Sequence, residues 1–295
     1  MKPALPILAA AAVGVQVGAA IVASRYVIGQ TTPVALALLR YAIGVLCLVP
    51  PLLLAARGRF ERRDIVPIGL LGIMQFGVLV VLLNFGLRYV AAGRGALLFA
   101  TMPLLTLVFA ASIGRERMTR AKFAGVLAAL LGVALALADK LQAGAGASEW
   151  VGALAVIAAA TSGAICSVLY RPYLTRYPTL HVSALAMVAS VGFLAVVAAT
   201  EGFFSGLPHF TAAGWAAVIF IGISSGVGYT LWLWALRHAS PTRVTVFLSL
   251  SPVTAALLGA LVLAEPLRWM QLAGLACVVA GIWLAFRPDN AAATS

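Results

Sequence analysis

Long apolar runs alternate with short polar gaps along the whole chain. A helix needs about 20 apolar residues to cross the hydrocarbon core of a membrane, and most of these runs have that length. The gaps are too short to fold alone; the longest are 57–64, 114–122 and 138–149. The pattern predicts an all-helical membrane protein with ten transmembrane helices. We expect them at about 5–23, 34–56, 65–87, 95–114, 123–138, 150–170, 182–200, 211–236, 244–264 and 269–286.

The composition supports this fold class and narrows the function. Of the 295 residues, 63% are hydrophobic and 9% are charged, whereas soluble proteins carry about 25% charged residues. No room remains for a soluble catalytic domain, so the function must reside within the helix bundle. Met1-Lys2 and the following apolar stretch are similar to a secretory signal, but the run is long enough to cross the membrane, and we expect it to remain as the first helix.

The positive charge indicates orientation rather than a nucleic-acid partner. The net charge is +12, but the Lys and Arg residues lie in the gaps between the runs. With a cytoplasmic N-terminus, 14 of them fall on the inner side and five on the outer side, which the positive-inside rule favours. We therefore expect both termini in the cytoplasm, with 57–64 and 115–122 inside and 140–149 outside. The inner set is Lys2, Arg57, Arg59, Arg62, Arg63, Arg115, Arg117, Arg120, Lys122, Arg171, Arg176, Arg237, Arg243 and Arg287, and the outer set is Arg25, Arg88, Arg94, Lys140 and Arg268.

The second half of the chain repeats the first. A shift of 149 residues aligns 77–137 with 226–286 without a gap, and 14 of the 61 positions match. Five helices per half is an odd number, so the two repeats, 5–138 and 150–286, must be inverted. Inverted repeats are typical of transporters in which two halves alternately open a central site. The informative matches are Gly77/Gly226, Arg88/Arg237, Arg94/Arg243, Pro103/Pro252, Glu116/Glu265, Gly125/Gly274 and Gly132/Gly281.

Two of the repeated segments resemble a known family. Glu-Arg-Met-Thr-Arg-Ala-Lys-Phe-Ala-Gly at 116–125 and Glu-Pro-Leu-Arg-Trp-Met-Gln-Leu-Ala-Gly at 265–274 resemble the EamA-domain repeat. So do the Pro103 and Pro252 helices before them and the stretch from Pro33 to Arg40. Over nearly its whole length the chain is similar to two EamA domains of the drug/metabolite transporter superfamily. The resemblance implies a ten-helix metabolite exporter of a bacterial inner membrane, closest in kind to amino-acid exporters, with a cavity lined mainly by helices 1, 3, 4, 6, 8 and 9.

The sequence matches the motifs of enzymes and pumps only weakly. Gly222-Ile-Ser-Ser-Gly226 fits the GxSxG pattern of serine hydrolases, but it lies inside an apolar run rather than at a strand-to-helix turn. The three histidines, His181, His209 and His238, lie at or beyond the ends of the runs. Cys47, Cys166 and Cys277 have neither disulfide nor zinc spacing. No ATP-binding loop is present. We expect no catalytic residue, metal or cofactor.

The charged residues also bear on energy coupling. None of the eight acidic residues lies centrally in a run, where a proton-driven pump would need a carboxylate. The first helix carries Gln16, where the small multidrug transporters of this superfamily carry a glutamate. We therefore expect passive or exchange-like transport. Arg40 is a charge inside a run, and it either reaches toward the outer headgroups or helps to hold a substrate carboxylate.

The remaining mid-run polar and aromatic side chains are candidates for the substrate path, or they bond neighbouring helices. Pro103 and Pro252 are candidate gating positions or purely structural kinks. The leading hypothesis is a secondary exporter of small neutral or zwitterionic metabolites, especially apolar amino acids, that works as a monomer or weak dimer in the lipid membrane. The alternatives are drug or nucleoside efflux, an intramembrane hydrolase, and a non-transporting scaffold or receptor. The path candidates are Gln16, Gln75, Asn84, Phe99, Thr101, Ser162, Ser224, Tyr229, Trp232 and Ser249.

Overall fold

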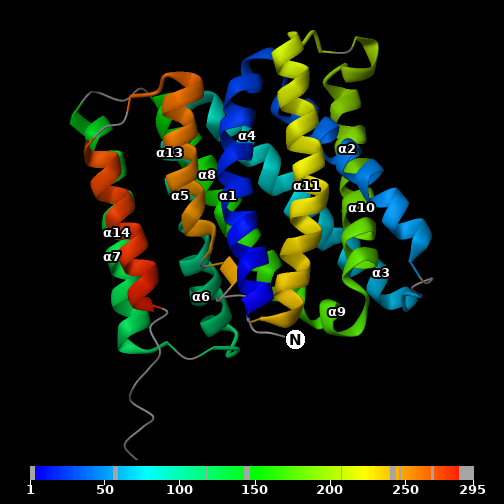
Figure 1. Ribbon diagram of the computed structural model, residues 1–295, viewed down its shortest axis with the longest axis horizontal. Helices are drawn as coiled ribbons and strands as arrows, with labels where there is room; N and C mark the ends of the chain where they lie inside the picture. Colours follow the sequence, from blue (N-terminus) through cyan, green and yellow to red (C-terminus); the bar gives the residue numbers. More distant parts are fainter. Residues whose placement is uncertain are drawn as a thin grey trace, which may run out of the picture.

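The regular elements of the structure are helices (Figure 1). The structure is a computed structural model, and it describes residues 4–55, 59–116, 118–142, 147–206, 208–239, 244–245, 247–266 and 269–285. Among these residues no strand is found. The elements are α1 (Ala4–Val27), η1 (Ile28–Gln30), α2 (Pro33–Leu54), α3 (Arg62–Gly72), η2 (Ile73–Val78), α4 (Leu79–Tyr89), α5 (Ala92–Phe99), α6 (Met102–Ser112), α7 (Arg120–Gln142), α8 (Ala147–Leu169), α9 (Arg171–Arg176), α10 (Thr179–Thr200), η3 (Phe203–Ser205), α11 (Ala212–His238), η4 (Phe247–Ser249), α13 (Leu250–Leu263) and α14 (Trp269–Ala285).

Seven helical segments are long and apolar enough to cross a membrane. Large apolar side chains such as Leu54 and Leu261 are more than four-fifths exposed on the outside of the bundle, which suits contact with lipid rather than water. The protein is therefore a multi-pass membrane protein. Seven of the ten expected crossings are confirmed by length and composition. They are Leu5–Gln30, Pro33–Leu54, Arg62–Tyr89, Ala92–Ser112, Ala147–Arg176, Thr179–Thr200 and Ala212–His238.

Helices from the two halves of the chain pack against each other in matched pairs. In the first half α1 packs against α11 and α13, and in the second half its counterpart α8 packs against α4 and α6. The counterparts α2 and α10 lie against each other. The last helices of the two halves, α7 and α14, form a pair at one side of the bundle (Figure 1).

Glycines allow the closest of these helix contacts. A Cβ atom on Gly14 would overlap the carbonyl oxygen of Phe247, and one on Gly18 would overlap that of Ser251. A Cβ on Gly226 would lie 2.8 Å from the carbonyl oxygen of Gly44. Within a membrane, helices associate through such close backbone packing, because lipid tails are as apolar as the side chains. The glycines around the GxSxG pattern are therefore packing positions.

Charged side chains tie the helix ends together. At one end of the bundle, Asp64 Oδ2 lies 2.6 Å from Arg176 Nη1 and accepts a 2.6 Å hydrogen bond from the Tyr177 hydroxyl. At the other end, Glu265 accepts a hydrogen bond from the backbone N–H of Ala92 at 3.0 Å, and so caps the start of α5. Arg25 lies 3.8 Å from Glu265 and donates to the last carbonyls of α4.

The first and last described helices share one end of the bundle. α1 begins and α14 ends at the end where α9 lies (Figure 1). An even number of crossings follows if each segment spans the membrane. Some residues of the orientation argument lie outside the described residues. They are Lys2, Arg57, Arg117, Arg243 and Arg287 of the inner set and Arg268 of the outer set, and the side chain of Lys140 is likewise not described.

The glycine contacts predict a contrast between two substitutions. Gly18→Ala should lower the free energy of unfolding by about 1–3 kcal/mol, because the added methyl group would separate α1 from α13. Gly192→Ala in α10 is the matched control, since no other heavy atom lies within 4 Å of its Cβ position. Thermal denaturation of both purified variants in detergent measures the difference. Equal denaturation midpoints would contradict the importance of the α1 contact.

The arrangement of the helix ends predicts opposite labelling of two exposed positions. Arg59 precedes α3, and Ser205 follows α10 at the other end of the bundle. In a background without the three native cysteines, Arg59→Cys and Ser205→Cys should react with an impermeant thiol reagent from opposite sides of the membrane. Right-side-out and inside-out sealed vesicles expose opposite sides of the membrane to the reagent, and each serves as the control for the other. Reaction of both cysteines from the same side would contradict this topology.

Candidate functional site

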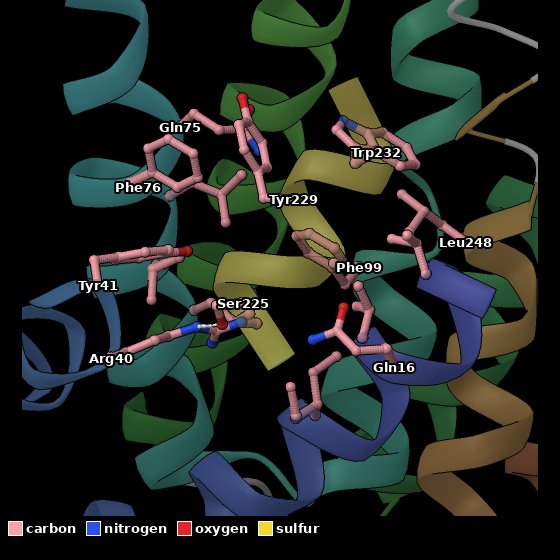
Figure 2. Close-up of a pocket in the computed structure, with 18 of the residues that line it drawn as sticks. Gln16, Arg40, Tyr41, Gln75, Phe76, Phe99, Ser225, Tyr229, Trp232 and Leu248 are labelled. Carbon is pink, nitrogen blue, oxygen red and sulfur yellow. Dashed lines mark hydrogen bonds between the residues drawn. The ribbon is translucent and has the colours of Figure 1, made fainter. Parts of the chain in front are cut away.

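A central cavity of about 90 Å³ lies among the helices (Figure 2). This volume is enough for several water molecules. Its walls come from α1, α2, η2, α4, α11 and η4 and from the junction of α5 and α6. The aromatic side chains that line it are Tyr41, Phe76, Phe99, Tyr229 and Trp232. The polar or charged side chains are Gln16, Arg40, Gln75 and Ser225.

Irregular helix segments place several of these side chains. Gln75 and Phe76 lie in η2, a π-helical stretch inside an otherwise α-helical crossing. Such stretches change the direction of the following side chains and are frequent at functional sites. Phe99 ends α5, just before a break at residues 100–101, and Leu248 lies in the 3-10 turn η4.

The two candidate gating prolines follow these irregular segments. Pro103 is the second residue of α6, and Pro252 is the third residue of α13. A proline is tolerated in the first turn of a helix, because its missing N–H has no partner there in any case. The helices α6 and α13 therefore each follow an irregular segment at an equivalent place in the two halves, with a buried proline in the first turn.

The cavity is lined by equivalent positions of the two halves. The first-half member of each pair is apolar, whereas the second half contributes a serine, a glycine, a tyrosine, a tryptophan and a leucine. The cavity thus lies between the halves, and its two sides differ in chemistry. The pairs, each 149 residues apart, are Phe76/Ser225, Leu79/Gly228, Val80/Tyr229, Leu83/Trp232 and Phe99/Leu248.

Arg40 brings a positive charge into this cavity. Its Nε donates a 2.6 Å hydrogen bond to the Oγ of Ser225, which in turn donates to the carbonyl oxygen of Ile221 at 2.5 Å. Ser225 lies roughly 20 Å along α11 from its start, at a rise of 1.5 Å per residue. The guanidinium carbon also lies 5.5 Å from the centre of the Tyr41 ring. The side chain therefore points into the bundle and not toward the headgroups.

Aromatic rings form one wall of the cavity. The rings of Phe76 and Tyr229 have centroids 4.2 Å apart in an edge-to-face arrangement, and Tyr41 lies 4.7 Å from Phe76 on its other side. Trp232 stands one helical turn beyond Tyr229 on α11 (Figure 2). Such a wall suits an apolar or aromatic group of a ligand, while a few polar groups fix its orientation.

Comparison with known proteins identifies the family. Residues 4–138 and 150–287 both match the EamA-like transporter family. The chain belongs to this family. An uncharacterized transporter of Archaeoglobus fulgidus is 28% identical over 92% of this chain and 94% of its own length. A protein of Streptantibioticus cattleyicolor, named a probable terminal-alkyne amino-acid exporter, is 32% identical over 77% of this chain and 74% of its own length.

Structural comparison agrees with the sequence match. A solved crystal structure superimposes with a TM-score of 0.71 over 94% of this chain and 95% of its own, at 20% identity. At that identity the likeness concerns the fold alone. Members of the EamA-like family are transporters and not enzymes, which fits the position of the GxSxG pattern in the middle of α11.

The EamA-like chain brings only part of the predicted path together. Half of the predicted residues line the central cavity: Gln16, Gln75, Phe99, Tyr229 and Trp232. Three others are buried and bond backbone carbonyls instead. Asn84 Nδ2 donates to Pro33 at 3.1 Å, Thr101 Oγ1 to Leu98 at 2.7 Å, and Ser162 Oγ to Met74 at 3.0 Å.

Two predicted serines also lie outside the central cavity. Ser224 accepts a 3.2 Å hydrogen bond from Gln16 Nε2 and faces a separate, apolar groove between α1 and α11. Ser249 ends η4 without lining the cavity. The neighbouring Ser225, one residue further along α11, takes the place expected for Ser224. A one-residue step turns an α-helix by about 100°, which is enough to move a side chain from one face to the next.

The lining helices also differ from those implied by the family resemblance. The helix α2 contributes Arg40 and Tyr41, whereas none of the lining side chains comes from α8, which covers the sixth span expected from the sequence. Sequence reasoning missed Tyr41 and Phe76 as cavity residues. The adjacent Arg40 is a signal that could have found Tyr41, because a mid-membrane charge marks a wet face.

Proposed function

We propose that this EamA-like protein is a secondary transporter that exports small neutral or zwitterionic metabolites, with apolar and aromatic amino acids as its main substrates. The observation that carries this proposal is the central cavity, which combines an aromatic wall with the amides of Gln16 and Gln75, the hydroxyl of Ser225 and the guanidinium of Arg40. The relative named as a probable amino-acid exporter supports the same substrate class.

Alternating access between two inverted five-helix repeats is the proposed mechanism. The segments α7, η4 with α13, and α14 would complete ten crossings, five in each half. The matched pairing of α1 with α11 and of α8 with α4 supports an inverted relation of the halves. A cavity lined by equivalent residues of both halves lies where two rocking units would meet.

The proposed orientation places both termini in the cytoplasm of a bacterial cell, with the protein in the inner membrane. Among the described residues, the end of the bundle that holds α9 and the start of α3 carries most of the basic residues in the gaps. Basic residues in short loops are retained on the cytoplasmic side. Substrate would then leave the cell when the cavity opens toward the opposite end.

We propose that transport by this protein is passive or exchange-like. Within the described part of the chain, no Asp or Glu side chain lines the cavity. The acidic residues Asp64 and Glu265 bond groups at the ends of the bundle instead. A cavity without a carboxylate has no ordinary site for a coupled proton. The outward gradient of the substrate itself is then sufficient to drive export.

Flux through the purified protein tests the proposed function. In liposomes, the protein should move phenylalanine without ATP and without an imposed pH gradient, and unlabelled phenylalanine should compete. Trp232→Ala and Gln75→Ala should reduce the flux by about tenfold, because each removes part of the cavity wall. Trp215→Ala is the matched control, since Trp215 lies near the start of α11 and is 38% exposed.

Two outcomes of this assay would count against the proposal. Flux that appears only under a proton gradient would overturn the passive mechanism. Movement of drugs or nucleosides in place of amino acids would overturn the substrate class and favour the alternative efflux function, which the same aromatic wall could serve.

The prolines provide a test of the proposed gating. Pro103→Ala and Pro252→Ala restore a backbone N–H beside the interruptions in the fourth crossing of each half. If the halves move at these points, either substitution should change the transport rate several-fold while the amount of folded protein stays nearly constant. Stopped-flow flux and the yield from size-exclusion chromatography measure the two quantities. Unchanged rates in both variants would assign the prolines a purely structural role.

A further inference from the structure

Among the described residues, no carboxylate accompanies Arg40 in the cavity lining. Arg40 lies seven residues after the start of α2, roughly 10 Å into the bundle at 1.5 Å per residue. A guanidinium keeps its proton at any pH in proteins, so the positive charge is permanent. Charged residues at such depth are costly, and they are usually retained for a ligand or a transport step.

One hydrogen bond holds the guanidinium of Arg40 and leaves part of it available. The Nε is bonded to the neutral Oγ of Ser225, and the Tyr41 ring lies beside the plane. Among the described residues, neither terminal nitrogen, Nη1 or Nη2, has a hydrogen-bond or ion-pair partner. Two parallel N–H groups of an arginine fit the two oxygens of a carboxylate.

The acidic residues that the structure describes do not neutralise this charge. Asp64 is bonded to Arg176 and Tyr177, and Glu265 caps α5 near Arg25. Glu149 lies 3.8 Å from Arg94 in the first turn of α5. These ion pairs belong to the ends of the bundle. A carboxylate on the cargo would supply the counter-charge that these residues do not give Arg40.

For an ammonium group, in contrast, the described wall of the same cavity provides no group of opposite charge. No described carboxylate lines the wall, and the guanidinium of Arg40 repels a second cation nearby. The amides of Gln16 and Gln75 and the aromatic rings are uncharged. Amide groups accept or donate hydrogen bonds equally well, so they do not select for an amine.

We propose that Arg40, held by Ser225, is the carboxylate anchor of the central cavity, and that the carboxylate and the apolar side group of a substrate are recognised while its amino group is not required. The substrate class is then apolar monocarboxylates, of which amino acids are one kind. This inference rests on the proposed function of the cavity, because it names the part of the substrate that the cavity recognises. Arg40 is a binding residue here, and Ser225 is a positioning residue.

Two phenylalanine analogues test this inference in the wild-type protein. Both compounds are assayed as competitors in liposomes. 3-Phenylpropanoate lacks only the amine of phenylalanine, and phenylalaninamide lacks only the carboxylate. The first should compete with labelled phenylalanine within about tenfold of phenylalanine itself. The second should be weaker by on the order of tenfold to a hundredfold, the usual effect of losing a hydrogen bond to a charged group.

Variants of Arg40 test the residue itself. Arg40→Gln should abolish the preference for 3-phenylpropanoate over phenylalaninamide, and Arg40→Lys should keep part of it. Ser225→Ala should weaken the preference without reversing it, because the guanidinium remains but is less firmly held. Arg237→Gln removes the same charge from an exposed position at the end of α11 and should change nothing. A cooperative thermal transition in detergent without ligand shows that each variant is folded, and its shift on addition of 3-phenylpropanoate reports binding without flux.

The outcomes separate this inference from the proposed function. If phenylalanine is transported but phenylalaninamide competes as well as 3-phenylpropanoate, the carboxylate anchor is wrong and the exporter remains. If phenylalanine is not transported while 3-phenylpropanoate stabilises the wild type and not Arg40→Gln, the anchor is supported and the amino-acid substrate is wrong. Retention of the preference in folded Arg40→Gln would also overturn the anchor.

Discussion

Close contact between helix backbones is the constraint on which the rest of the structure depends. In a membrane, burial of apolar side chains against each other gains little over their contact with lipid, so association relies on packing. Gly14 and Gly18 let α1 touch the backbone of η4 and the start of α13, and Gly226 does the same for α11 and α2. These contacts bring α1, α2 and α11 near enough to enclose a cavity, while larger residues elsewhere on the same helices hold it open.

The irregular helix segments depend on that tight frame. Backbone groups without helical partners are tolerated at membrane depth only where protein or a wet cavity covers them. The π-helical turn of η2, the break after Phe99 and the 3-10 turn η4 all lie beside the central cavity. Four of the lining side chains therefore come from the least regular parts of the bundle, namely Gln75, Phe76, Phe99 and Leu248.

The sequence predicts the helices far better than it predicts which side chains meet. Apolar runs define the crossings because each one needs a minimum length, and seven of the ten are confirmed. The faces are harder to predict, because a helix that is apolar all round has no amphipathic pattern to orient it. Asn84 and Ser162 are polar and mid-membrane like Gln75, yet they bond backbone carbonyls of neighbouring helices. Phe76 lies in a π turn, and nothing in its local sequence signals that turn.

The two halves share a backbone plan but divide the chemistry of the cavity between them. Equivalent positions give Leu79 and Val80 on one side and Gly228 and Tyr229 on the other. A symmetric pair of repeats with identical side chains would offer a small ligand two equal orientations. Here Arg40 comes from the first half and its hydrogen-bond partner Ser225 from the second. A hydrogen bond between the two halves therefore holds the charged side chain in place. If the halves rock against each other, the bond between Nε and Oγ must stretch or rotate. The strength with which the cavity holds an anion would then change with the conformation, and a transporter needs such a change to release its cargo.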